Sequence, residues 1–199
     1  MAFLTIVAPL GTRRRLWTSA GTWRVVCSVL LLGAQSVSAQ TAPSKEYQIK
    51  AVFLFHFAQF VEWPSAAFAS ADAPLVIGIL GEDPFGAYLD ETVRGEKVQN
   101  RPLEIQRYRR LDEIKICHIL FIGSSETETY EEIFPKLQGR SILTVGDAEG
   151  FATRGMIRFL TERNRIRLRV NVGVARAAGL TISSKLLRAA EIVGAERAR

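Results

Sequence analysis

The spacing of hydrophobic and polar positions changes several times along this chain, and each change predicts a different element. An almost uninterrupted apolar segment over 45–62 contains no glycine or proline and predicts a helix, which Trp63 and Pro64 would end. Continuous apolar runs at 75–80 and 117–122 are typical of strands that helices cover on both faces. Further strands are expected at 101–108, 141–145, 156–161 and 166–170, and further helices at 84–93, about 125–137, 171–178 and 183–193.

Local signals indicate where these helices begin. Asp83 can cap a helix whose first residue is Pro84, a position at which the missing N–H is not needed. Ser125 and Glu128 have the spacing of a capping box, in which each side chain bonds the other's backbone N–H. Serines available as caps also precede the first and last helices, at 44 and at 183 or 184.

The order of the elements predicts one α/β domain. Alternating strands and helices build parallel strand pairs, whereas strands 156–161 and 166–170 are separated by so few residues that they must form an antiparallel hairpin. Strand 101–108 is more polar than the others, which suggests a sheet edge. We therefore expect a single-domain three-layer sandwich with a mixed, mostly parallel sheet and a late antiparallel hairpin.

The first 39 residues have the pattern of a cleaved secretory signal. Arginines precede a short apolar stretch, and small residues lead to a cleavage site between Ala39 and Gln40. The apolar stretch has about ten residues, fewer than the roughly 20 that a membrane-spanning helix needs. We therefore expect an exported chain that does not span the membrane, with one domain over 40–199.

The charge of the chain changes once this segment is set aside. The formal net charge is +6, with 26 Lys and Arg against 20 Asp and Glu. Four arginines, at 13, 14, 15 and 24, precede residue 40, and no acidic residue does. The remainder carries a formal charge of only +2, so the composition does not favour nucleic acid as a partner.

Catalytic and metal-binding patterns are sparse. His56 and His118 have no Cys, Asp or Glu at metal-ligand spacing, and the glycines match neither the dinucleotide nor the phosphate-loop motif. Cys117 lies in an apolar run that favours a buried thiol, and Ser125 fits a helix cap better than a nucleophile. We expect no catalytic residue, metal or cofactor, and a hydrolase using Ser125 or Cys117 ranks last among the alternatives.

Three loops at the carboxyl ends of the predicted parallel strands form a candidate ligand crevice. The loops 81–84, 123–127 and 146–150 combine glycine with short polar side chains and precede helix N-termini, which bind carboxylates or phosphates. Ordinary turn chemistry explains the same residues. The side chains that would line a small-ligand site here are Asp83, Ser124, Ser125 and Asp147.

A second candidate surface is a row of four arginines. Arg163, Arg165, Arg167 and Arg169, here called the arginine row, share one face of the predicted strand, and Arg158 would join from the paired strand. Such a row suits bidentate contacts with acidic groups, although a solvated face explains it equally well. The aromatic side chains of the first helix favour either core packing or a partner. The remaining partner-binding candidates are Phe53, Phe57, Phe60 and Lys185.

The segment Lys50–Pro64 closely resembles the opening motif of the YfiR family of periplasmic proteins. Further blocks agree in order at 81–86, 117–122, 143–147, 150–152, 164–167 and 182–187. The resemblance implies a non-enzymatic, often dimeric α/β protein. It also implies a partner, the periplasmic part of a membrane diguanylate cyclase that the protein holds inactive, which lowers cyclic-di-GMP output.

Two positions depart from the pattern of the family. Relatives often carry a cysteine where this chain has Gly78, so the bridge to Cys117 that the resemblance would imply is missing. Relatives also tend to have an acidic residue in the late strand where this chain has Arg169. The second departure concerns whether this chain uses the same partner-binding surface as its relatives.

Overall fold

The computed structural model describes residues 43–163 and 165–194. The predicted signal segment and its cleavage site at Ala39 and Gln40 lie outside the described residues.

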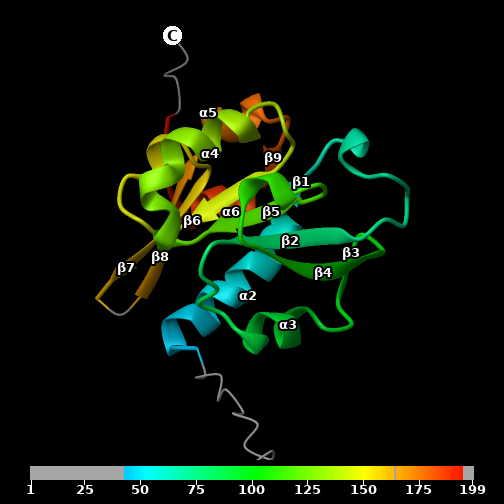
Figure 1. The fold of residues 1–199 in the computed structure, drawn as a ribbon, viewed down its shortest axis with the longest axis horizontal. Helices are drawn as coiled ribbons and strands as arrows, with labels where there is room; N and C mark the ends of the chain where they lie inside the picture. The colour runs from blue at the N-terminus through cyan, green and yellow to red at the C-terminus, as the bar shows by residue number, and fades with distance from the viewer. Residues whose placement is uncertain (1–42, 164, 195–199) are drawn as a thin grey trace, which may run out of the picture. The chain divides into compact units, whose positions relative to one another are not determined.

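An eight-stranded mixed sheet forms the centre of the described domain (Figure 1). All neighbouring strands run parallel except the pairs β7–β8 and β3–β4. From one edge to the other the strands are β10 (Ala190–Val193), β8 (Arg165–Asn171), β7 (Ile157–Glu162), β6 (Leu143–Gly146), β5 (Ile119–Ile122), β2 (Leu75–Leu80), β4 (Arg101–Tyr108) and β3 (Lys97–Val98).

Helices lie on both sides of this sheet, which confirms the predicted α/β sandwich (Figure 1). Helices α2 (Lys45–Phe60) and α3 (Ala87–Val93) cover one face, and α4 (Tyr130–Leu137) covers the other. Two shorter helices, α5 (Val172–Ala177) and α6 (Ser184–Arg188), follow β8, and β1 (Val61–Glu62) pairs antiparallel with β9 (Thr181–Ile182). The described residues also contain four 3-10 helices: η2 (Ser65–Ala67), η3 (Leu111–Glu113), η4 (Ser124–Thr129) and η5 (Phe151–Thr153).

The hydrophobic core has one part on each face of the sheet. Leu54 and Phe57 of α2 are completely buried against the face that carries Ile77. On the other face α4 packs over β5, where Leu120 meets the cluster that also holds Phe151. Successive residues of the central strands therefore point alternately into the two parts of the core, which is why these strands are apolar throughout.

Helix α3 begins at Ala87, so the predicted start at Pro84 is wrong. The Asp83 carboxylate does accept backbone hydrogen bonds, from the N–H groups of Phe85 (2.7 Å) and Gly86 (3.2 Å). These bonds close a turn ahead of the helix instead of capping it, and Gly86 has φ +52°, a conformation that glycine adopts at little cost.

The predicted capping box of Ser125 and Glu128 is also wrong. Both residues lie inside η4, and α4 starts only at Tyr130. The Ser125 hydroxyl accepts a hydrogen bond from the backbone N–H of Glu82 (3.1 Å), on the neighbouring loop. A tertiary contact between two loops thus replaces the local cap.

The predicted final helix over 183–193 splits into a helix and a strand. Ser183 caps α6, because its Oγ accepts from the N–H of Leu186 (3.4 Å), but α6 ends at Arg188. The next segment, β10, pairs parallel with β8 in the register Ala190 to Leu168. Without this segment the outer edge of β8 would have unpaired backbone N–H and C=O groups. The hydrogen bonds that β10 makes with them outweigh the local preference of residues 190–193 for helix.

Strand β4 lies one position inside the sheet edge. The two-residue strand β3 covers only its first residues, Arg101 and Pro102, so most of β4 has a single neighbour as expected of an edge.

Candidate functional site

The first turns of α2 contact the predicted ligand crevice at Asp147. Lys50 is only 2% exposed, and its Nζ lies 2.7 Å from Asp147 Oδ2 and 2.6 Å from Glu46 Oε1. Tyr47 donates its hydroxyl to the same Asp147 oxygen (2.9 Å). Asp147 follows β6 directly, so this network fastens the helix to the carboxyl end of the central strands.

Electrostatics within this network follow from burial and pairing. The hydrogen bond from Lys50 lowers the pKa of Glu46, and burial followed by the charge of Asp147 raises the pKa of Tyr47. Thr161 of β7 also donates to Glu46 Oε1 (2.9 Å), which joins the helix to the β7–β8 hairpin. Sequence reasoning missed this network; its only sequence signal was a lysine within an apolar helix, four residues after a glutamate.

The other crevice candidates also contact the chain itself. Besides its turn, Asp83 accepts a hydrogen bond from Nε of Arg107 on β4 (2.7 Å). Ser125 joins its loop to Glu82, and Ser124 is exposed. The three loops are thus brought together as expected, but the polar atoms of Asp83, Ser125 and Asp147 are engaged within the chain. Their assignment to a small-ligand site stays a prediction.

Neither nucleophile considered from the sequence contacts a histidine among the described residues. Cys117 is buried, its thiol donates to the Ile119 carbonyl (3.1 Å), and burial raises its pKa to about 12. A thiolate is therefore scarce at neutral pH. The hydroxyl of Ser125 donates to a carboxylate oxygen of Glu126 (3.2 Å), and no imidazole contacts it.

The two histidines have different surroundings. The ring of His118 accepts a hydrogen bond at Nδ1 from the N–H of Val76 (3.0 Å), so Nε2 carries the proton and donates to the Ala67 carbonyl (3.2 Å). Burial lowers its pKa. His56 lies on α2 within 3.3 Å of the side-chain oxygen of Gln59. Among residues 43–163 and 165–194, no three His, Cys, Asp or Glu side chains are grouped to hold a metal ion.

The outer side of α2 carries an apolar strip. Ile49 is 48% and Val52 36% exposed, and Phe53 and Phe60 are partly exposed on the same side. Phe57, in contrast, is completely buried and stacks on Phe159 of β7, with ring centroids 5.8 Å apart. This corrects the expectation that Phe57 lies on a partner surface: it supports the core instead.

Three members of the arginine row lie on the face of the sheet opposite α2. Arg163 precedes β8 and lies at the hairpin turn, so its predicted place on the strand face is wrong. Arg165, Arg167 and Arg169 alternate on β8 with Ile166, Leu168 and Val170, which face the α2 core. Strand pairing places Arg158 of β7 directly opposite Arg169. The sequence-predicted partner residues therefore belong to two surfaces.

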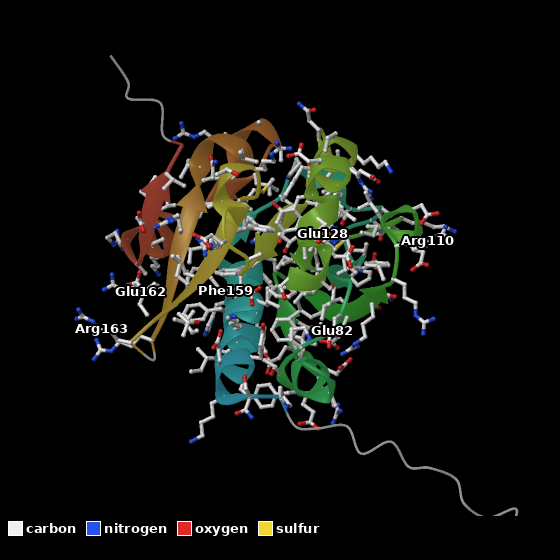
Figure 2. The ribbon with its side chains drawn as sticks, turned by 60° about the vertical axis from the view of Figure 1, so that its left-hand side comes forward. Glu82, Arg110, Glu128, Phe159, Glu162 and Arg163 are labelled. Carbon is white, nitrogen blue, oxygen red and sulfur yellow. The ribbon has the colours of Figure 1, made fainter. Side chains whose placement is uncertain are left out.

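Acidic side chains neutralise part of the arginine row. Arg169 donates to Glu191 Oε2 from Nε (3.1 Å) and Nη2 (2.9 Å), and Nε of Arg167 lies 3.8 Å from Glu162. Arg163 stands at the hairpin turn with φ +48°, where Figure 2 shows it projecting from the body of the domain. Lys185 is exposed on α6, apart from this strand.

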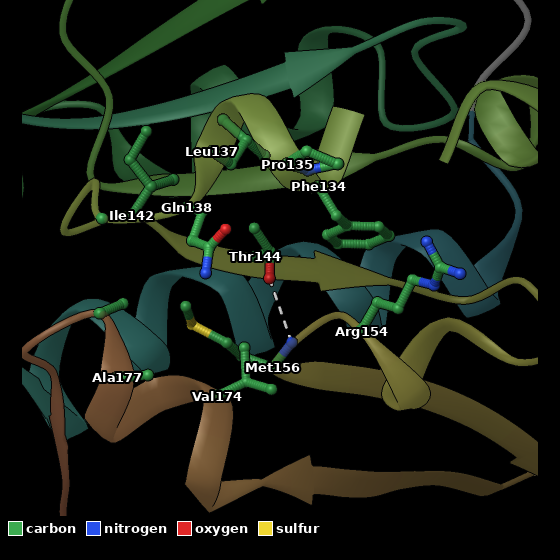
Figure 3. Close-up of a pocket in the computed structure, with 12 residues that line it drawn as sticks. Phe134, Pro135, Leu137, Gln138, Ile142, Thr144, Arg154, Met156, Val174 and Ala177 are labelled. Atoms are coloured by element: carbon green, nitrogen blue, oxygen red, sulfur yellow. Dashed lines mark hydrogen bonds between the residues drawn. The ribbon is translucent and has the colours of Figure 1, made fainter. Parts of the chain in front are cut away.

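An apolar cavity of about 330 Å³ lies between α4 and α5, at the other end of the strands from the crevice. Figure 3 shows Phe134, Met156 and Val174 around it, with Arg154 at one side. Thr144 Oγ1 contributes to its wall but already accepts from the N–H of Met156 (3.1 Å). No sequence motif indicated this cavity, because its lining comes from four separate segments.

The sequence profile of the YfiR/HmsC-like family matches residues 47–191, which extend from α2 into β10. The chain belongs to this family. Proteins of the YfiR/HmsC-like family are periplasmic regulators rather than enzymes. No curated protein matches the chain in sequence. Within the described residues, no helix combines the length and the apolar character that crossing a bilayer requires.

Proposed function

We propose that this chain is an exported regulator that binds the periplasmic part of an inner-membrane diguanylate cyclase and holds it inactive, lowering cyclic-di-GMP output. The observation that carries the proposal is the family match over nearly the whole described domain. Burial raises the pKa of the Cys117 thiol to about 12, which disfavours the alternative of a hydrolase that uses Cys117.

The arginine row is the surface that we assign to the partner. Arg165 and Arg167 are exposed on one strand face, and among the described residues only Arg167 has a carboxylate within 4 Å, that of Glu162 at 3.8 Å. Glu162 also stands opposite Arg165 across the strand pair. Guanidinium groups suit bidentate contacts with acidic side chains of a partner. The apolar strip on α2, centred on Ile49 and Val52, is a second exposed surface against which a partner can pack.

The proposed mechanism is a shift of population. A regulator that binds the inactive state of the cyclase more tightly than the active state reduces the active fraction, by a factor set by the ratio of the two affinities. A further component that covers the arginine row would release the cyclase.

The test is capture of solubilised inner-membrane proteins by the purified protein. We expect capture of a protein with a diguanylate cyclase domain, whose cyclase rate falls when the purified protein is added. Arg165→Glu/Arg167→Glu should abolish both effects, because the reversed charges repel the acidic partner. Arg176→Glu/Arg188→Glu, which changes two exposed arginines on other elements, is the matched control. Failure to capture a cyclase, or an unchanged cyclase rate, contradicts the proposal.

A second candidate function, binding of a small ligand, is favoured by the cavity between α4 and α5. Its volume of about 330 Å³ lies at the lower end of the range of small-molecule sites. Small aromatic acids or amines should then raise the unfolding temperature, and Ala177→Leu, which adds bulk to the lining, should remove the rise. Ala189→Leu, at an exposed position outside the cavity, should keep it. A rise that survives Ala177→Leu would exclude this cavity.

A further inference from the structure

Arg158 is a partly exposed cation without a partner among the described residues. Its Nε is buried and meets no hydrogen-bond acceptor there, and no described carboxylate lies within 4 Å of its guanidinium. Burial of an unpaired charged donor is costly, so native structures normally satisfy such groups with protein, water or an ion. The position of Arg158 on β7 therefore requires an explanation beyond the packing of the sheet.

The nearest cation makes the situation less favourable still. Arg158 stands directly opposite Arg169 across the β7–β8 pair, and like charges at facing positions repel. Arg169 has its own counter-charge in Glu191, which contacts Nε and Nη2 and leaves Nη1 without a described acceptor. Glu149 lies nearby but forms no ion pair within 4 Å with either arginine.

Arg158 and Arg169 both line one open cavity of about 550 Å³, together with Glu149, Thr153 and Asn171. The cavity lies between η5 and the end of β10, on the face of the sheet opposite α2. Asn171 in its wall donates to the Ala152 carbonyl (3.0 Å) and accepts from the N–H of Val174 (3.2 Å). Thr153 donates its hydroxyl to the Gly150 carbonyl (2.7 Å). The volume matches that of small-molecule sites.

We propose that this cavity binds a small anion, the carboxylate or phosphate group of a small molecule, with Arg158 as the main contact and Nη1 of Arg169 as the second. An anion would supply the missing acceptors of Arg158 and relieve its repulsion with Arg169. This site is separate from the apolar cavity between α4 and α5 and from the strand-end crevice. It shares Arg169 with the arginine row, but anion binding does not require the proposed regulation of a cyclase.

The test is a titration of the purified protein with inorganic phosphate and, separately, with citrate, at constant ionic strength set with sodium chloride. We expect at least one of them to raise the unfolding temperature saturably, and Arg158→Gln to weaken that binding at least tenfold. Arg158→Lys should keep part of it, because the positive charge remains. Arg176→Gln, which removes an exposed arginine of α5, is the matched control and should bind as the parent does. Binding of phosphate would show that the site takes a phosphate group, and binding of citrate that it takes a carboxylate.

Two results would overturn this inference. One is that neither anion raises the unfolding temperature at concentrations up to about 10 mM, which is ten times the dissociation constant of a site with millimolar affinity. The other is an equal rise in the parent and in Arg158→Gln, which would place the anion elsewhere. Without added anion, Arg158→Gln should be at least as stable as the parent, since it removes an unpaired charge. A large loss of stability there would show that Arg158 has a structural partner.

Discussion

Lys50 illustrates how a single residue can fix the position of an element. Its ammonium group is buried between Glu46 and Asp147, so the first turns of α2 are held at the carboxyl end of β6. The rings of Tyr47 and Phe159 also lie close to Nζ, 4.3 and 5.8 Å from their centroids. A buried ammonium group is stable at such a site only if the carboxylates that pair with it are present.

Lys50→Met should therefore destabilise the protein by about 3–5 kcal/mol, the usual cost of breaking a buried ion pair by removing one partner. Asp147 would be left with the Tyr47 hydroxyl as its remaining side-chain donor. The free energy of unfolding in urea measures the loss. Lys45→Met, at an exposed position of the same helix, is the control, and Lys50→Met/Asp147→Asn should recover part of the stability. Equal stability of the two lysine variants would show that the pair contributes nothing.

His118 should make stability depend on pH. Burial lowers its pKa below the ordinary 6.5, so the unfolded chain binds the proton more readily than the folded one. Its contribution is complete above pH 6.5 and is lost as the pH falls from 6.5 through the lower folded pKa. Urea midpoints measured against pH should decline less steeply below pH 6.5 in His118→Gln than in the parent. Parallel curves would contradict this assignment.

At the scale of elements, local pattern was enough wherever local interactions decide the structure. The helix over 45–62, the buried strand 75–80 and the late hairpin all formed within two residues of their predicted bounds. The errors arose where distant residues decide. Segment 190–193 has no local strand signal and becomes β10 only because β8 offers it a partner.

The candidate site was less predictable than the fold for the same reason. Side chains alternate between the two faces of a strand, so the sequence alone predicts that Arg165, Arg167 and Arg169 share one face. The counter-charge Glu191, the ion pair of Lys50 with Asp147 and the burial of Phe57 involve residues far apart in the chain. No spacing rule encodes such contacts.

Gly78 of β2 and Cys117, two residues before β5, offer a test of the departure at Gly78. A Cβ atom at Gly78 would lie 2.8 Å from Cys117 Sγ and 2.7 Å from the Tyr108 ring. Gly78→Cys should thus form a disulfide with Cys117 once the Tyr108 ring shifts. The bridge closes a loop of about 40 residues, worth up to about 4 kcal/mol before strain.

Thiol titration and unfolding with and without reductant measure this bridge. Formation removes two electrons and two protons from the thiols, so an oxidant such as oxidised glutathione must be added. Burial raises the pKa of Cys117 to about 12, so its thiolate is scarce and the reaction should be slow. Gly78→Ser, similar in size but unable to bridge, is the control and should be less stable than the parent. Two free thiols in oxidised Gly78→Cys would contradict the geometry.

At the scale of the whole molecule, the domain has two exposed surfaces on opposite faces of its sheet, the apolar strip of α2 and the arginine row. We propose that one of them binds the cyclase and the other a second copy of this chain. Light scattering of Ile49→Glu/Val52→Glu, beside Arg165→Glu/Arg167→Glu, would show which surface a dimer uses.

Export should remove the first 39 residues. The mass of the protein recovered from the periplasm is expected to correspond to a chain that begins at Gln40, because small residues precede that bond. An uncleaved mass, or protein confined to the cytoplasm, would contradict the assignment of the signal segment.

The most direct test of the account is the cellular level of cyclic-di-GMP with and without this protein. Deletion of its gene should raise the level several-fold, and restoring the parent chain should lower it again. The Arg165→Glu/Arg167→Glu chain should not lower it, although it folds and is exported like the parent. An unchanged level after deletion would contradict repression of a cyclase, and full complementation by the charge-reversed chain would remove the arginine row as its contact surface.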